Sequence, residues 1–326
     1  MQNMSRGEFI KIGAVGIAAS IAPSRLWGID KIVNDNIDDV LLKNLIANND
    51  LSVGRYLSLG ERRLGEMYYR SLAEEFAVHT ASYCQPGSQY YKSDKLLSRL
   101  DTIIVSLLQP QYPNGMLDSG GNRQSPPDTA FLMDHLCPAM NALHKDASPA
   151  LQPLMDKVRT FLVKVGEGLK TGGVHTPNHR WEVAAALAQL YSIIKDDGYV
   201  ERIDEWLEEG IDINGDGNYS ERSRLYAAVV DRSLLTIGRL LNRPSLFTPV
   251  KKNLETTYYY METNGELVTV DSRRQDQNSS VSIMSYYLPY RYLAIYYGDD
   301  TLAAITRLIE TSYLPKLCKD FSRMNG

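Results

Sequence analysis

The sequence has few cysteines, no run of basic residues and no apolar segment of membrane-spanning length. Its three cysteines, Cys84, Cys137 and Cys318, lie far apart and form no Cys-x-x-Cys pair. This spacing excludes a disulfide framework and a zinc motif, and it predicts buried thiols. Charged residues make up 23% of the chain and the net charge is −4. Nucleic acid is therefore not expected as a partner, and an anionic ligand has to be met by local arginines.

The first residues predict an export signal. Arg6 and Lys11 precede an apolar stretch at residues 12–22, which is too short to span a bilayer comfortably. Residues 5–11 resemble a bacterial twin-arginine signal in which Gly7 replaces the second arginine, so the twin-arginine and general secretory routes both stay open. We expect a signal over residues 1–24, a linker over 25–37, a periplasmic location and no stable insertion in a membrane.

From residue 38 onward, apolar residues recur at steps of three and four, which is typical of helices. The pattern predicts one all-α domain over residues 38–326, in which antiparallel helical hairpins close into an (α/α) toroid. Residues 266–270 follow the turn signal Asn264-Gly265 and predict a small β-hairpin inserted between helices. Helices are expected at residues 38–48, 54–80, 93–109, 128–145, 149–168, 179–195, 198–209, 222–241, 245–260, 280–297 and 299–317.

Three connections are too elaborate for plain turns, namely residues 109–128, 170–177 and 210–220. Long ordered loops in compact domains are often functional, and successive hairpins can present these three at one rim. Tyrosine is also overused, with 21 residues against six phenylalanines. That composition suits a sugar-binding cleft, although polar-tipped core packing is the better explanation for most of these tyrosines.

The first motif begins a helix. Thr176 is a plausible N-cap with Pro177 at the first helical position, which places Asn178 and His179 in an exposed first turn. Free N–H groups and the helix dipole favour an anion there. The alternative is that Asn178 only caps the helix and that His179 is structural. Glu182, one turn later, can orient Asn178 or His179, or it can pair with Arg180 or another cation.

The second motif opens like a calcium loop. Asp212, Asn214 and Asp216 supply oxygens at alternate positions, but Ser223 stands where such a loop has its bidentate glutamate. A tight Asx-turn loop without metal is the main expectation, with calcium as the weaker alternative and no other cofactor. Tyr226 follows on the first turn of the next helix.

In this order the two motifs, Asn178-His179 with Glu182 and then Asp216-Gly217 with Glu221, Arg222, Ser223 and Tyr226, resemble the heparinase II/III-like polysaccharide lyases and their alginate- and oligoalginate-cleaving relatives. The resemblance covers residues 40–320, the helical toroid of that family. It implies a lyase that cleaves a uronate-containing polysaccharide or oligosaccharide by β-elimination. By position, Asn178 neutralises the uronate carboxylate, His179 is a second neutraliser or base, and Tyr226 exchanges protons, with Tyr219 as the competing tyrosine.

The resemblance further implies that residues 121–129, including Gln124 and Asp128, line the glycone side, where Arg123 can meet an acid group bidentately. Tyr226 needs positive charge beside it to act as a base, and Arg222 or Arg224 is expected to supply that charge. Arg273 or Arg274, after the short strand, can reach the rim or lie in a solvated loop.

Members of that family usually continue into a β-sandwich that often supplies another histidine, whereas this sequence runs to Gly326. The sandwich is expected to be lost, to lie on another chain or to have been removed. Two other functions remain open. A toroid-type glycoside hydrolase needs two carboxylates across the sugar, for which Asp128 and Asp216 are candidates. A non-catalytic glycan-binding scaffold needs no such pair of carboxylates.

Overall fold

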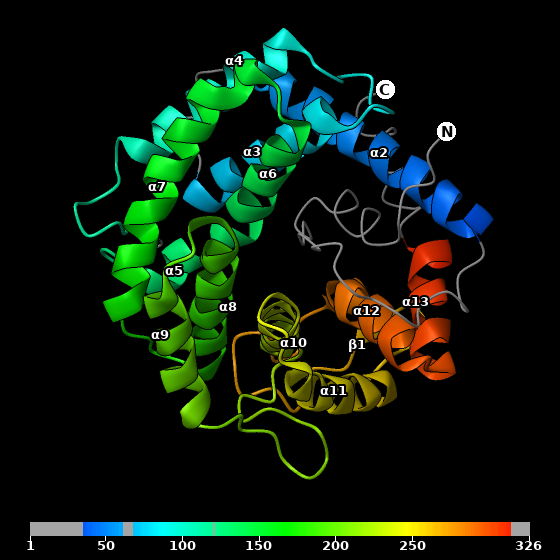
Figure 1. The fold of residues 1–326 in the computed structure, drawn as a ribbon. Coiled ribbons are helices and arrows are strands. Elements are labelled where there is room, and N and C mark those ends of the chain that lie inside the picture. Colours follow the sequence, from blue (N-terminus) through cyan, green and yellow to red (C-terminus); the bar gives the residue numbers. More distant parts are fainter. Residues whose placement is uncertain (1–34, 61–67, 120, 314–326) are drawn as a thin grey trace.

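The computed structural model describes residues 35–60, 68–119 and 121–313. The expected signal at 1–24, most of the linker and Cys318 lie outside these residues. The described chain is mostly helical and carries one two-stranded antiparallel sheet (Figure 1), which confirms the all-α prediction and the small β element. In chain order the elements are α2 (Asp35–Ser58), α3 (Tyr69–Cys84), α4 (Asp94–Leu108), α5 (Pro126–Ala130), α6 (Met133–Asp146), η2 (Pro149–Leu151), α7 (Gln152–Thr171), α8 (Pro177–Ile194), α9 (Asp197–Glu208), α10 (Arg224–Leu240), η3 (Pro244–Leu246), α11 (Phe247–Tyr259), β1 (Glu266–Leu267), β2 (Val281–Ser282), η4 (Ile283–Tyr286), α12 (Tyr287–Tyr297) and α13 (Asp300–Ser312).

Consecutive helices pack in pairs. The pairs are α3 with α4, α6 with α7, α8 with α9, α10 with α11, and α12 with α13. One helix of each pair also packs against its counterpart in the next pair, in the series α3, α6, α8, α10, α12. We call these five the central series. Figure 1 shows them following an arc, with α7, α9 and α11 on its outer side.

Helix α8 lies in the middle of the central series. It packs against α6, α7, α9 and α10, and every residue from 181 to 190 is buried. Because a helix that is apolar all round has to be buried on all sides, the alanine-rich stretch 184–188 suits this place. Small side chains also let neighbouring helices approach closely. The start of α8 is thereby held on a rigid element.

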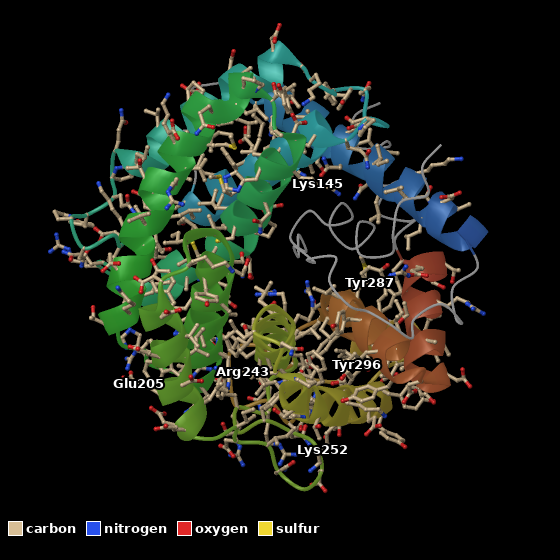
Figure 2. All side chains as sticks on the ribbon, in the orientation of Figure 1. Lys145, Glu205, Arg243, Lys252, Tyr287 and Tyr296 are labelled. Carbon is tan, nitrogen blue, oxygen red and sulfur yellow. The ribbon has the colours of Figure 1, made fainter. Side chains whose placement is uncertain are left out.

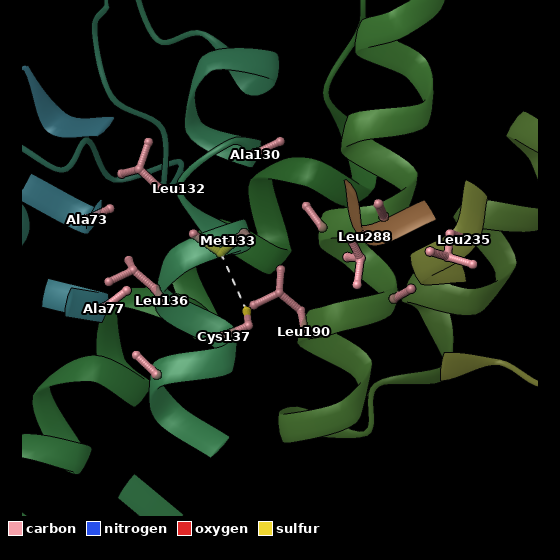
Figure 3. Close-up of a cluster of buried hydrophobic side chains, with 14 of the residues drawn as sticks. Ala73, Ala77, Ala130, Leu132, Met133, Leu136, Cys137, Leu190, Leu235 and Leu288 are labelled. Carbon is pink, nitrogen blue, oxygen red and sulfur yellow. Dashed lines mark hydrogen bonds between the residues drawn. The ribbon is translucent and has the colours of Figure 1, made fainter. Parts of the chain in front are cut away.

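The hydrophobic core runs along the whole central series. Figure 3 shows side chains from α3, α6, α8, α10 and α12 gathered in it, among them Ala73, Leu136, Leu190, Leu235 and Leu288. Within α6, the buried Cys137 contacts Met133 through sulfur at 3.9 Å. Both described cysteines, Cys137 and the half-buried Cys84, are free thiols.

The first two helices differ from the prediction. A break was expected between residues 48 and 54, yet α2 is continuous from Asp35 to Ser58, and α3 starts only at Tyr69. The sequence Asn48-Asn49-Asp50 is typical of a turn, but tertiary hydrogen bonds satisfy two of these side chains inside the helix. Asn49 Nδ2 donates to Val78 O and Ser82 Oγ, both at 2.8 Å.

The predicted strand is confirmed but is shorter than expected. Glu266 pairs with Ser282 and Leu267 with Val281, so the sheet joins the end of α11 to the start of η4. Gly265 precedes the strand with a φ of +81°, a conformation that favours glycine. The 13 residues between β1 and β2, 268–280, form a long loop that returns toward α10.

Glu205 on α9 and Lys252 on α11 lie on the outer side of the arc in Figure 2. Among the described residues, no helix combines the length and the apolar character needed to cross a membrane.

Candidate functional site

Helix α8 begins in an unexpected way. Pro177 is its first residue and Thr176 holds the N-cap position, as predicted. The Thr176 hydroxyl, however, donates to Asn178 Oδ1 at 2.7 Å instead of accepting a backbone N–H. The Asn178 N–H donates to Glu221 Oε2 at 3.1 Å. Glu221 therefore supplies the acceptor for this helix end, and the expectation that the Asn178 N–H is free is wrong.

The side chain of Asn178 is fully buried, with 0% of its surface exposed. Its oxygen is taken by Thr176, while its Nδ2 has no hydrogen-bond partner within the described part of the chain. A buried donor left unpaired is costly, and such groups in native structures call for an explanation. The Asn178 side chain thus keeps one hydrogen-bond donor that no described acceptor uses.

Glu221 connects Asn178 to the loop after β1. Its Oε1 lies 3.4 Å from Arg274 Nε, in an ion pair that forms no hydrogen bond between these two atoms. Burial raises the pKa of the Glu221 carboxyl, and the Asn178 N–H and the positive charge of Arg274 oppose that rise. The carboxylate is thus held by one N–H and one loosely placed guanidinium.

Tyr226 lies on the other side of Arg274. Ser223 caps α10 by accepting the Tyr226 N–H at 3.0 Å, which places the tyrosine in the first turn as predicted. Its ring centroid lies 5.0 Å from the Arg274 guanidinium, a cation–π distance. Its hydroxyl donates to Gln275 Oε1 at 2.9 Å. Asn178, Glu221, Arg274 and Tyr226 therefore form one continuous set of contacts.

Buried ion pairs hold the loop that carries Arg274. Arg224, which is 1% exposed, donates through Nη2 to both oxygens of Asp271, at 3.1 and 3.0 Å. Asp276 accepts the Leu225 N–H at 3.2 Å. Both ends of the segment 271–276 are therefore tied to the first turn of α10.

The cation beside Tyr226 is not the one expected. Arg222, whose φ is +50°, pairs with Asp271 at 3.2 Å, and Arg224 also binds Asp271. Arg274 is the arginine that faces the Tyr226 ring.

His179 is half-buried and lies among charged and aromatic groups. Its ring centroid is 6.3 Å from that of Phe131 and 6.4 Å from that of His175. Burial lowers the pKa of His179, Asp128 acts in the opposite sense, and the charges of Arg70 and Arg274 lower it further. The imidazole is therefore neutral near neutral pH. Within the described residues its Nδ1 has no hydrogen-bond partner.

Asp128 fastens the 121–129 loop to the neighbouring helix α3. It accepts hydrogen bonds from Arg70 at 2.7 Å, Ser125 at 2.8 Å and Asn122 at 3.0 Å. Burial alone would raise the pKa of Asp128, but these donors outweigh it and the pKa is lowered. The Arg70 guanidinium also covers the Phe131 ring at 3.8 Å. Asp128 thus stays ionised, which disfavours it as the general acid of a hydrolase.

Glu182 does not belong to this group, and the expectation that it orients Asn178 or His179, or pairs with Arg180, is corrected. Its carboxylate points into the core, where it accepts from Ser233 at 3.1 Å and from Arg232 at 3.3 Å. The same Arg232 nitrogen lies 2.8 Å from Asp134. Both oxygens of this contact set, those of Glu182 and Asp134, are thus directed at Arg232 and Ser233 rather than at Asn178 or His179.

Tyr219 is also directed inward. It is 7% exposed, and its hydroxyl donates at 2.7 Å to Asp231, which is fully buried. Burial and the Asp231 charge raise the pKa of this phenol. The hydroxyl is thus committed to a core carboxyl, which leaves Tyr226 as the tyrosine at the contact set described above.

The remaining expected binding residues are dispersed. Arg123 is exposed, and Gln124 accepts from Asn114 at 2.8 Å. Arg273 is exposed too, and its backbone N–H donates to Glu221 O at 3.3 Å. Its neighbour Arg274 is the one that turns toward Glu221 and Tyr226.

The candidate calcium loop is closed by its own hydrogen bonds. Asn214 Oδ1 accepts the N–H groups of Asp216 at 3.1 Å and Asn218 at 2.9 Å, which is an Asx-turn. Gly217 turns the chain with a φ of +83°. Asp212 and Asp216 are exposed. Across residues 35–60, 68–119 and 121–313, no group of three histidine, cysteine or acidic side chains is arranged to hold a metal ion.

Neither a family model nor a curated protein matches this chain. The case for a function therefore depends on the geometry just described. Sequence reasoning missed Arg70 and Gln275 and preferred Arg273 to Arg274. No local pattern marks Arg70, which reaches Asp128 only because α3 packs against α6, the helix that follows α5. The sequence Arg273-Arg274 indicated the loop 271–277 but did not show which of the two arginines faces Glu221 and Tyr226.

Proposed function

We propose that this chain binds an acidic sugar between the start of α8, the start of α10 and the loop 271–277, and cleaves its polymer by β-elimination. The observation that carries the proposal is the buried Asn178 Nδ2, which lacks a partner among the described residues and lies next to His179. A carboxylate oxygen of the sugar is the acceptor that this donor fits.

The same groups suit the chemistry of elimination. A base removes the C5 proton of the uronate, the electron pair forms the C4–C5 double bond, and the bond from C4 to the leaving oxygen breaks. Negative charge develops on the uronate carboxylate, where the Asn178 amide stabilises it as a fixed donor. The phenolate form of Tyr226 takes the C5 proton, becomes the phenol and then gives that proton to the leaving oxygen. The neutral imidazole of His179 accepts or donates a hydrogen bond in the same site.

The proposal includes the toroid. The helix pairs and the central series are the arrangement expected of an open (α/α) toroid, in which the starts of α8 and α10 and the loop 271–277 share one rim. The close packing of α8 against α10 supports this placement, since it brings the two catalytic helix starts together.

Product analysis tests the activity. The chain is incubated with a panel of uronate polysaccharides that includes alginate, hyaluronan, heparan sulfate and polygalacturonate. We expect one member to give new ultraviolet absorbance from unsaturated uronate ends. Shorter products without absorbance would indicate a hydrolase, and binding without any product would indicate a glycan-binding scaffold. Either result would contradict the lyase proposal.

A further inference from the structure

We propose that Arg274 is the cation that receives the acid group of the sugar, and that Glu221 is a resident carboxylate that pairs with Arg274 until the sugar binds. This inference rests on the proposed function, because it names the charged partner of the ligand at the same site. It predicts that the chain distinguishes an acidic sugar from its neutral ester through Arg274.

The pairing between the two side chains is incomplete. Glu221 Oε1 and Arg274 Nε face each other at 3.4 Å, and neither atom has a hydrogen-bond partner among the described residues. An arginine that closes a bidentate pair with a carboxylate uses two parallel N–H bonds. Arg274 makes no such fork with Glu221, so it can offer one to a second carboxylate.

The position of the pair also fits an exchange of partners. Glu221 already has one firm contact, the Asn178 N–H, and keeps it without Arg274. Arg274 is about one third exposed, at 31%, while Glu221 is 9% exposed. A ligand therefore reaches the guanidinium first. A carboxylate bound there lies beside the Tyr226 ring, which the guanidinium faces, and next to Glu221, which accepts the Asn178 backbone N–H.

The neighbouring arginines are not available for this role. Arg224 is buried and bound to Asp271 through both carboxylate oxygens. Arg222 binds the same carboxylate. Arg70 is paired with Asp128 in a hydrogen bond of 2.7 Å. Arg274 is the arginine of this group whose ion pair lacks a hydrogen bond.

Binding measurements with paired ligands test the inference. Calorimetry compares tetrasaccharides of mannuronate, guluronate and glucuronate with their methyl esters, for the unaltered chain and for Arg274→Gln. Losing a hydrogen bond to a charged group weakens binding by about 10- to 100-fold. We expect that loss for the acid and little change for the ester. The matched control is Arg273→Gln, which removes an exposed charge one position earlier and should change neither affinity.

A second variant keeps the test informative if Arg274→Gln weakens the fold. Glu221→Gln retains an oxygen for the Asn178 N–H but removes the competing charge, so we expect tighter binding of the acid and unchanged binding of the ester. Full discrimination between acid and ester in Arg274→Gln, or equal losses in Arg274→Gln and Arg273→Gln, would overturn the inference. If one of these outcomes were found and Asn178→Ala nevertheless abolished binding of the acid, the role of Arg274 would be refuted but the proposed function would remain. Failure of the unaltered chain to bind any acid would overturn both.

Discussion

The most telling residue is Asn178, because its surroundings use only part of its hydrogen-bonding capacity. Its oxygen and its backbone N–H are both engaged, yet its amide donor is buried without a described partner. An asparagine that served only as a helix cap would use its side-chain oxygen on the backbone of its own first turn. Here Glu221, from another segment, accepts the backbone N–H of this first turn. The side-chain amide of Asn178 is therefore left for a ligand.

Tyr226 gives the first prediction. Replacing it with phenylalanine removes the phenol that transfers protons while leaving the ring against Arg274. We expect Tyr226→Phe to lower kcat for the formation of unsaturated ends by at least about 100-fold, the usual contribution of general acid–base catalysis. The dissociation constant for the sugar should stay within about threefold, since one hydroxyl to Gln275 is the only bond lost among the described contacts.

The matched control is Tyr259→Phe, which removes a hydroxyl from a side chain that is 83% exposed. It should leave kcat unchanged. Normal turnover in Tyr226→Phe, measured by the absorbance of the products, would remove this tyrosine from the mechanism.

Glu182 gives a prediction about pH. Burial raises the pKa of its carboxyl to about 8, the negative charge of Asp134 adds to the rise, and Arg232 opposes it. The folded protein therefore binds a proton that the unfolded chain releases above its ordinary pKa of 4.5. The free energy of unfolding should fall as the pH rises from about 4.5 to about 8, by at least about 1 kcal/mol.

Denaturant unfolding at several pH values checks this. In Glu182→Gln the fall should be smaller, because the glutamine stays neutral throughout. Glu208→Gln, at an exposed position on α9, is the control and should keep the full pH dependence. An identical slope in Glu182→Gln would show that other groups cause it.

At this scale the sequence correctly placed Asn178, His179 and Tyr226 in the first turns of helices, because each follows a local signal for a helix start. It misplaced Glu182 and Tyr219, since spacing alone does not show which side of a helix faces the core. Arg274 and Arg70 join through tertiary contacts between segments far apart in the sequence.

At the scale of elements, the helices were predictable wherever apolar periodicity and a capping residue agree. Ser223 before α10 and Asp299 before α13 both accept first-turn N–H groups. The exception is α2, where the sequence Asn49-Asp50 is typical of a turn although the helix continues through it. Asp50 accepts from Ser82 at 2.7 Å and from Ser88 at 2.6 Å, so the polar pair is stabilised by α3 and the segment after it.

The packing of α7 against α9 gives a prediction about stability. A Cβ added at Gly166 would lie 2.0 Å from the hydroxyl oxygen of Tyr199, whose side chain is fully buried. Alanine is otherwise the better helix former by about 1 kcal/mol. The clash should dominate, and Gly166→Ala should lower the free energy of unfolding by about 1–3 kcal/mol.

Thermal or denaturant unfolding measures this loss. Gly215→Ala is the control, because no heavy atom lies within 4 Å of its added Cβ, and it should change stability by less than about 0.5 kcal/mol. A Gly166→Ala protein more stable than the original would show that the two helices separate at little cost.

At the scale of the molecule, one side of the candidate site is built on the packed helices of the central series and the other side on a loop. Asp134 of α6, Glu182 of α8 and Arg232 of α10 form one ion cluster that ties three of its helices together. The starts of α8 and α10 are fixed by this packing. Arg274 and Gln275 belong to the long loop between β1 and β2, which packs against these helix starts.

The sequence predicted the helical hairpins, since each helix carries its own periodicity. It did not predict how the loop after β1 returns to α10, because that return depends on the buried pair of Arg224 and Asp271, 47 positions apart in the sequence. The groups that surround a ligand therefore come partly from motifs and partly from long-range packing.

A crystal structure of the Tyr226→Phe protein with a bound uronate tetrasaccharide tests the central claim most directly. The account predicts a uronate carboxylate within about 3 Å of Asn178 Nδ2, with the ring of residue 226 and the His179 imidazole beside the same sugar unit. A sugar bound elsewhere on the molecule, or one whose carboxylate faces solvent while the Asn178 amide stays unpaired, would contradict it.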